Sequence, residues 1–301
     1  MTQSLAFPLV AAVVIAALAT SVHRRLPPRL ATRFIVVSLA AVAVAAIPTV
    51  LLVALAFLAH VPVVGLGFQW CAQAIGLHDS VPWWLGVVAV AVLVLGAARS
   101  IRLWREHRAF RVDVGRSPYV ASDAVPFAVT LPGRAGQIVV SSAMIEMLDE
   151  DEQRVVIAHE RAHARYRHDR YVFVAQLAAA AIPPLRHLAQ RVIYSVERWA
   201  DEAAAAVCGD RQLVAVTLGK VALRANDALA PGRVAWWDRG ASSQFGGFGI
   251  ASRMEALLAP PVRRPRVAGI AAVWSSVLAV MVLSAYQLHH LERLVGALCP
   301  H

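Results

Sequence analysis

Four long apolar stretches constrain the fold of this chain more than any other feature. They cover residues 5–22, 34–59, 81–98 and 267–288. Each is about 18–26 residues long, and a helix of about 20 apolar residues crosses the hydrocarbon core of a bilayer. The chain is 58% hydrophobic and only 16% charged, whereas about a quarter of the residues of a soluble domain are charged. A very large soluble core is the alternative, but the clustering of the apolar residues favours four transmembrane helices.

The positions of the arginines predict how these helices are oriented. Lys220 is the only lysine, so the net charge of +10 rests on arginine. Arginines gather between the first two stretches, directly after the third and directly before the fourth, whereas residues 60–80 contain no Lys or Arg. Because basic loops stay in the cytoplasm, we expect both termini to be extracytoplasmic and residues 99–266 to be cytoplasmic. The first stretch is not typical of a cleaved signal peptide, since its basic residues follow the apolar run.

The composition bears on two further questions. A basic chain can bind nucleic acid, but we find no basic motif on a recognisable nucleic-acid-binding fold and expect no direct contact with nucleic acid. Cys208 falls in the cytoplasmic segment and is expected to be reduced. Cys71 and Cys299 both fall outside on this topology, and whether they form a disulfide stays open.

We therefore predict a mainly α-helical integral membrane protein with a small α+β cytoplasmic domain. Its parts are an N-terminal membrane region at residues 1–98 with three transmembrane helices, the domain at 99–266, a fourth transmembrane helix at 267–288 and a short extracytoplasmic tail at 289–301.

The domain opens with an arginine-rich helix at residues 99–111 that runs straight out of the third span. Residues 126–131 and 137–141 are rich in Val, Phe and Thr and flank a turn that contains Pro and Gly. This pattern predicts a β-hairpin. The hairpin is either purely structural or offers its edge to an extended substrate.

Helices follow the hairpin. Four acidic residues at 149–152 predict a helix start, and the helical pattern continues through an apolar run at 171–182 to Pro183 and Pro184. That run is too short to cross a bilayer, so it is a buried core helix or an interfacial one. Further helices are expected at about 185–207, 211–226 and 250–258, with a Gly- and Ser-rich loop at 231–249.

The sequence HERAHARYRHD, which begins at His159, contains the motif H-E-x-x-H. On a helix, His159 and His163 share one face and can bind one metal ion, for which zinc is the expected choice. Glu160 is turned about 100° away along the helix. It is therefore poorly placed as a ligand but suited to act as the general base that takes a proton from the attacking water.

A zinc site needs a third protein ligand, and the sequence VERWADEA supplies the best candidate, Glu197. Two antiparallel helices joined near Pro183 would bring Glu197 to the histidine pair. Asp201, one turn further, would orient a ligand histidine. The alternative is that Glu197 and Asp201 form surface ion pairs with Arg198 or Arg191. His168 does not share the face of the histidine pair, and we expect it to be solvated rather than to bind metal.

Taken together, these residues resemble the BlaR/MecR family of membrane-embedded zinc metallopeptidases, and more distantly the HtpX and CAAX prenyl protease group. The resemblance implies a zincin-like domain with one Zn²⁺ per chain, held by His159, His163 and Glu197, with Glu160 as catalytic base. It also implies a protein or peptide substrate, such as a winged-helix repressor. Substrate-binding residues and the oxyanion stabiliser stay unidentified, with Arg253, His168 and Tyr171 as candidates for the latter.

The chain departs from the antibiotic-sensing members of that family. Those carry an extracellular penicillin-binding domain, which acylates at a Ser-x-x-Lys motif. Here only about a dozen residues follow the last span, and the sole lysine, Lys220, is preceded three residues earlier by Thr217. We therefore expect no covalent β-lactam sensing within this chain.

The leading functional hypothesis is thus a zinc endopeptidase in the membrane, with the lipid bilayer and a protein substrate as partners and signalling by regulatory proteolysis as its role. The alternative is a non-enzymatic signalling or scaffold protein with a degenerate protease domain. A transporter is disfavoured because the predicted spans contain no Asp, Glu, Lys or Arg. The oligomeric state and the activating signal are not indicated.

Overall fold

The computed structural model describes residues 26–59, 82–109, 117–133, 136–228 and 249–260, together with a few isolated positions. The predicted transmembrane helices at 5–22 and 267–288 lie outside the described residues apart from single positions, as do both termini. The loop predicted at 231–249 lies outside them up to its last residue, and Cys71 and Cys299 are also outside.

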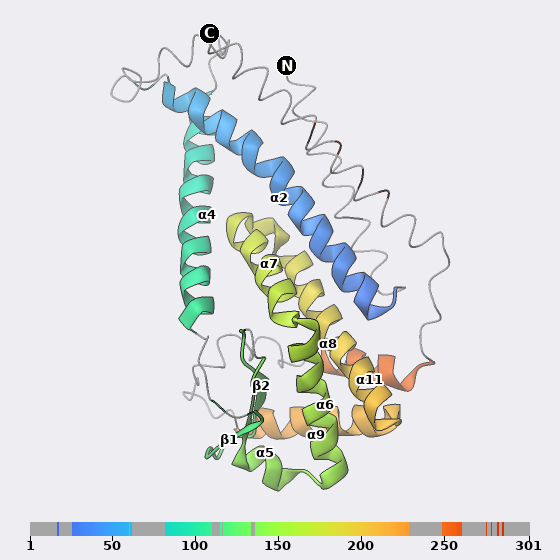
Figure 1. Cartoon of the computed structure of the whole chain (residues 1–301). Coiled ribbons are helices and arrows are strands. Elements are labelled where there is room, and N and C mark those ends of the chain that lie inside the picture. Colours follow the sequence, from blue (N-terminus) through green and yellow to red (C-terminus); the bar gives the residue numbers. More distant parts are fainter. Residues whose placement is uncertain are drawn as a thin grey trace.

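Two long apolar helices form one end of the described structure (Figure 1). Helix α2 spans Pro28–Ala59 and contains Pro48, and helix α4 spans Trp83–Ala109. Both are long and apolar enough to cross a membrane, a test that the core helix of a soluble protein can also pass. Helix α4 continues past residue 98 without a break, so the arginine-rich extension is a direct continuation of this helix, as predicted.

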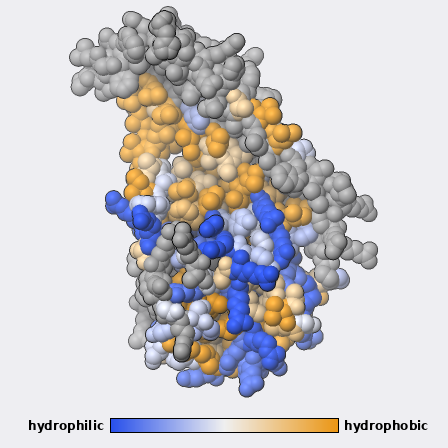
Figure 2. All heavy atoms as spheres, viewed as in Figure 1, coloured by the Kyte–Doolittle hydropathy of each residue, from blue (hydrophilic) through white to orange (hydrophobic). Residues whose placement is uncertain are grey.

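These two helices leave large apolar side chains exposed. Figure 2 shows hydrophobic residues over the upper part of the molecule and hydrophilic residues gathered over the lower part. Along α2 the exposed apolar residues recur every three or four positions, and along α4 they are frequent from its first turn onward. They include Val44, Ile47, Leu51, Leu55, Val88, Val92 and Leu95. A contiguous apolar surface of this kind marks contact with a membrane or a partner.

A helical hairpin packs between α2 and α4. It consists of α7 (His168–Ala181), a 3₁₀ turn η2 (Pro183–Leu185) and α8 (Arg186–Cys208). Its buried residues form one apolar cluster with the lower part of α2, including Phe34, Ile35, Leu39, Ala175, Ala178, Val192 and Val196. Helix α4 approaches closely at Gly96, where a Cβ would lie 2.9 Å from the carbonyl oxygen of Ala181. The apolar run at 171–182 is therefore a packed core helix, the first of the two alternatives.

A small three-stranded sheet lies beside the helices. The strands are β1 (Tyr119–Ala121), β2 (Ala128–Thr130) and β3 (Ile138–Ser141), in the order β1-β3-β2. Strands β2 and β3 pair antiparallel, which confirms the predicted hairpin. Strand β1 pairs parallel to β3 and was not predicted, because it is only three residues long and largely exposed. Strand β3 is buried in the centre, so β2 is an edge strand.

The short helix α5 (Ser142–Met147) leads to α6 (Glu150–Tyr166), the helix that carries the histidine motif. A capping box begins α6: the Asp149 side chain accepts from the backbone N–H of Glu152, and the Glu152 carboxylate accepts from the N–H of Asp149. The helix ends at Arg167, whose φ of 55° lies in the left-handed region. The prediction of an uninterrupted helix from 150 to 182 was wrong, because Arg167 turns the chain into α7.

Helices α9 (Arg211–Ala228) and α11 (Ile250–Leu258) complete the described domain, and both confirm predicted helices. Each contributes to a second apolar cluster with α6 and α8, whose members include Val155, Ala158, Ala204, Val214 and Leu257. This packing holds α11 against α9 and against α8, the helix that carries Glu197.

Candidate metal centre

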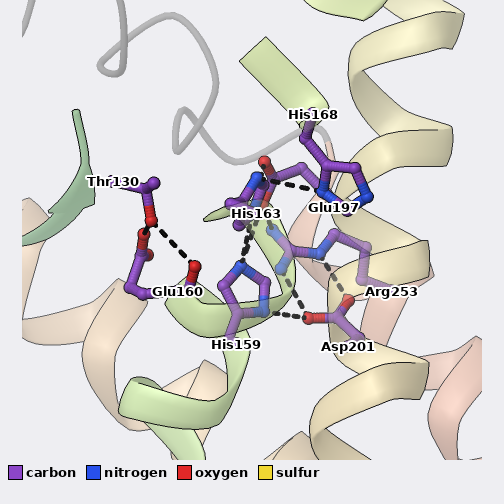
Figure 3. Close-up of polar contacts among 8 residues, drawn as sticks. All are labelled: Thr130, His159, Glu160, His163, His168, Glu197, Asp201 and Arg253. Carbon is purple, nitrogen blue, oxygen red and sulfur yellow. Dashed lines mark hydrogen bonds and ion pairs between the residues drawn. The ribbon is translucent and has the colours of Figure 1, made fainter. Parts of the chain in front are cut away.

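The structure brings His159, His163 and Glu197 together between α6 and α8. One ligand atom from each residue lies within 4.8 Å of the other two. The histidines come from successive turns of one face of α6, and Glu197 comes from the facing side of α8, as expected for antiparallel helices (Figure 3). All three side chains are largely buried, with exposed fractions of 13–16%.

The spacing of the donor atoms suits a single tetrahedral metal ion. The two Nε2 atoms of the histidines are 3.1 Å apart. Glu197 Oε2 lies 3.5 Å from His159 Nε2, and Glu197 Oε1 lies 3.6 Å from His163 Nε2. Ligands at about 2.0–2.2 Å from a tetrahedral zinc ion are about 3.3–3.6 Å apart. Two imidazoles and one carboxylate are also the donor set of hydrolytic zinc sites with an open fourth position, so these residues fit a zinc ion.

Asp201 contacts the far nitrogen of one of these histidines. Its Oδ1 lies 3.1 Å from His159 Nδ1, and its side chain is 3% exposed. An Nδ1–H···carboxylate bond fixes which nitrogen of the ring is free, and here it leaves Nε2 for a metal. The structure thus places Asp201 where the sequence analysis expected an orienting residue.

Arg253 of α11 pairs with two carboxylates of α8, Asp201 and Glu197, and nothing in the sequence indicated these contacts. Its Nε and Nη2 donate to the two oxygens of Asp201 at 2.8 and 2.7 Å, and its Nη1 lies 3.1 Å from Glu197 Oε2. The predicted alternative, ion pairs of these carboxylates with Arg198 or Arg191, does not describe these contacts. These contacts make Arg253 a less suitable oxyanion stabiliser, because its guanidinium is already engaged with Asp201 and Glu197.

The neighbouring positive groups determine the charge state of the two carboxylates. Burial alone would raise the pKa values of Glu197 and Asp201, but Arg253 and the contacts with the ligand histidines together outweigh burial and hold both pKa values below their usual range. Both groups are therefore ionised at neutral pH. An ionised carboxylate is the form that binds a metal or accepts a proton from a histidine.

The two ligand histidines differ in charge state. Burial lowers the pKa of His159, but hydrogen bonds and charges from Asp201 and Glu197 outweigh it and raise the pKa to about 10. Burial also lowers the pKa of His163, and there the carboxylates do not overcome it. In the metal-free protein at neutral pH, His159 is thus protonated and His163 is neutral.

His168 is buried rather than solvated, which corrects the prediction from the sequence. It is 1% exposed, and its Nδ1 lies 3.2 Å from His163 Nδ1. Its ring packs against Trp199 and Tyr166, at centroid distances of 4.7 and 5.9 Å. Burial lowers its pKa to about 2, so it is neutral and can accept a hydrogen bond from His163. The left-handed turn at Arg167 brings His168 there, and a continuous helix would not have done so.

Glu160 occupies the neighbouring face of α6 and contacts the edge strand. Thr130 is the last residue of β2. Its Oγ1 lies 2.7 Å from Glu160 Oε2 and 2.8 Å from the backbone oxygen of Glu160 (Figure 3). Glu160 is 8% exposed, so this hydroxyl orients a carboxylate with little freedom of its own. Thr130 was missed, because nothing in a short Thr-containing strand indicates which helix it will face.

Two histidines and a carboxylate on facing helices, with a glutamate directly after the first histidine, are an arrangement typical of metal-dependent hydrolases. Residues 93–184 of the chain match the model of peptidase family M48. The matched segment covers about a third of the chain and contains His159, Glu160 and His163, while Glu197 follows it. M48 peptidases are zinc metallopeptidases, so the match supports a metallopeptidase. Neither a curated protein nor a solved structure matches the chain.

Proposed function

We propose that this protein is a membrane-bound zinc endopeptidase with one Zn²⁺ held by His159, His163 and Glu197. The observation that carries the proposal is the donor geometry: ligand atoms of three largely buried side chains from two helices lie 3.1–3.6 Å apart. A chance group of surface residues would not combine this spacing with a contact from Asp201 to one ligand and an ion pair from Arg253 to another.

The chemistry that zinc supplies in such a site is acidification of water and polarisation of the substrate carbonyl. Glu160 then acts as the general base: its carboxylate takes the proton of the attacking water and delivers it to the amine that leaves. Thr130 holds this carboxylate through its hydroxyl. Asp201 and His168 hold the rings of His159 and His163 in the orientation that leaves their Nε2 atoms free.

The edge strand β2 supports an extended peptide as substrate. Its partner β3 lies on one side, and no described strand pairs with its other side. A substrate segment can add to such an edge through main-chain hydrogen bonds. Because Thr130 of β2 touches Glu160, a peptide bound there would run past the general base. This favours the substrate-binding role of the hairpin over a purely structural one.

Membrane placement rests on the exposure of the apolar helices. In the most apolar windows of α2 and α4, only 25% and 17% of the residues are buried, whereas the core helix of a soluble domain is mostly buried. We propose that both helices cross the bilayer and that the metal centre faces the cytoplasm, in accordance with the distribution of arginine. The resemblance to the BlaR/MecR family suggests a regulatory substrate, such as a winged-helix repressor.

The test compares wild type with Glu160→Gln, which keeps the shape of the side chain but cannot take a proton. We expect the variant to retain stoichiometric zinc in the purified protein and to lose cleavage at least about a hundredfold. A map of cleaved cytoplasmic proteins in cells with wild type or Glu160→Gln identifies the substrate. Glu150→Gln, at an exposed glutamate of the same helix, is the matched control.

Loss of zinc in His163→Ala checks the ligand set in the same preparations. If Glu160→Gln keeps both its zinc and its full set of cleavage products, the general-base mechanism is wrong. If wild type binds zinc but yields no cleavage product that the variant lacks, the protein is a scaffold rather than a peptidase.

A further inference from the structure

A second site lies on the face of α6 that turns away from the metal centre. A cavity of about 890 Å³ is bordered by α6, by α8 and by the N-terminal end of α2. Two of its residues, Arg161 and Arg165, each follow a ligand histidine by two positions, which places them about 200° round the helix from the histidines. In Figure 1, the lower end of α2 lies beside α8.

The lining of this cavity is strongly basic. Four arginines line it, namely Arg29, Arg161, Arg165 and Arg198. Among the described lining residues the only carboxylate is Glu202. Glu202 is already paired with Arg211, whose Nη2 donates to Glu202 Oε1 at 3.0 Å. The arginines of the cavity are thus left without a compensating charge from the described lining.

Arg198 carries part of this excess positive charge in a largely buried position, where an unpaired charge is unfavourable. It is only 8% exposed, yet within the described part of the chain it forms no hydrogen bond or ion pair. A largely buried arginine whose guanidinium has no charge partner is stabilised by an anion bound beside it. The next residue, Trp199, also lines the cavity, and its buried Nε1 has no partner among the described residues either.

Contacts with two aromatic residues fix the position of Arg29 before any anion binds. Its Nη2 donates to the hydroxyl of Tyr166 at 2.6 Å. Its guanidinium lies over the rings of Tyr166 and Trp199, at 4.7 and 5.4 Å from their centroids. A stacked guanidinium with free N–H groups is the arrangement that proteins use to bind phosphate, because its planar fork matches two phosphate oxygens.

We propose that this cavity binds a phosphate-bearing anion, with Arg29, Arg161, Arg165 and Arg198 as its ligands. Its volume exceeds what one phosphate group needs and falls in the range of small-molecule sites, so an organic group attached to the phosphate fits as well. The phosphate belongs either to a soluble compound or to the headgroup of an anionic lipid. The proposal is independent of the peptidase activity, since none of these arginines contacts the metal ligands in the described contacts.

The experiment is a binding titration on the full chain, delipidated in detergent and followed by native mass spectrometry. The probes are inorganic phosphate, phosphatidylglycerol, zwitterionic phosphatidylcholine and hexaglutamate. We expect one bound anion per chain, with binding weakened about tenfold by Arg165→Gln, which removes charged hydrogen bonds. Arg165 is exposed, so this variant should fold, and Arg198→Gln provides a second variant at the buried position.

Arg154→Gln is the matched control, because Arg154 is an exposed arginine of the same helix that lies outside the cavity. Binding of phosphatidylglycerol without inorganic phosphate identifies a lipid site, and binding of inorganic phosphate identifies a soluble ligand; both support the proposal. It is overturned if neither binds, if Arg154→Gln weakens binding as much as Arg165→Gln does, or if only hexaglutamate binds, which would indicate an acidic peptide.

Discussion

At the scale of single residues, the metal centre is a set of charges that compensate one another. Arg253 contributes most to keeping Asp201 and Glu197 ionised, and these carboxylates in turn keep His159 protonated in the metal-free protein. A metal ion needs the neutral imidazole. Zinc must therefore displace a proton from His159, whereas His163 is already neutral and releases none.

This charge balance predicts how zinc binding depends on pH. The pKa of His159 is raised to about 10, so below that pH a proton competes with zinc, and the apparent affinity should rise about tenfold per pH unit between pH 7 and 9. Zinc binding should release about one proton at pH 8. Asp201→Asn should reduce this release, because it removes a charge that raises the pKa of His159. Calorimetric titration of zinc in buffers of different ionisation enthalpy measures the protons, and an unchanged release in Asp201→Asn would contradict the assignment.

Thr130 offers a second test at this scale. Thr130→Val removes the hydroxyl that holds Glu160, and we expect kcat to fall about tenfold, the usual effect of one hydrogen bond to a charged group. Zinc content should stay stoichiometric, because Thr130 contacts none of the three ligands in the described contacts. Thr130→Ser should retain most of the activity. Equal activity of the Val and Ser variants, on the substrate that the cleavage map identifies, would show that the hydroxyl does not position the base.

At the scale of elements, the site depends on how α11 is held against α8 and α9. Arg211, the first residue of α9, donates to the carbonyl oxygens of Ala256 and Leu257 at 2.9 and 2.8 Å. These are carbonyls of the last turn of α11, which lack partners within the helix. Arg211 therefore caps the helix that supplies Arg253 to the metal centre.

Arg211→Met should loosen α11. We expect backbone amide exchange in residues 250–258 to become at least about tenfold faster, since two hydrogen bonds from a charged group are lost. Arg224→Met is the control, because Arg224 is an exposed arginine of the same helix. Hydrogen–deuterium exchange on the purified protein measures the effect, and protection equal to that of the wild type would mean that the apolar cluster around Leu257 alone holds α11.

The sequence predicted the local elements of this fold better than its long-range contacts. Helical spacing alone placed His159 with His163, and the proline pair at 183–184 predicted the antiparallel return that brings Glu197 to them. The pairing of Asp201 with Arg253 spans 52 residues, and nothing local distinguishes Arg253 from the other arginines. The buried position of His168 depends on a left-handed residue at Arg167, and a non-glycine residue gives no sequence signal for that conformation.

At the scale of the whole molecule, the apolar and hydrophilic parts are separated along its length (Figure 2). The exposed apolar residues of α2 and α4 lie at one end of the molecule (Figure 1), and the metal centre lies between α6 and α8. A bilayer around α2 and α4 would cover the apolar end and leave the metal centre on one side of the membrane. In the topology proposed from the arginine pattern, that side is the cytoplasm.

The three native cysteines test this topology without added tags. Cys208, at the end of α8, belongs to the side of the metal centre, whereas the topology places Cys71 and Cys299 on the opposite side. We expect a membrane-impermeant maleimide to label a variant with Cys71 as its sole cysteine in intact cells. A variant with only Cys208 should be labelled only after permeabilisation.

Single-cysteine variants also remove any disulfide between Cys71 and Cys299, so the absence of labelling at Cys71 cannot be attributed to pairing. Labelling of Cys208 in intact cells would instead place the metal centre outside the cytoplasm, and a cytoplasmic repressor could then not be its substrate.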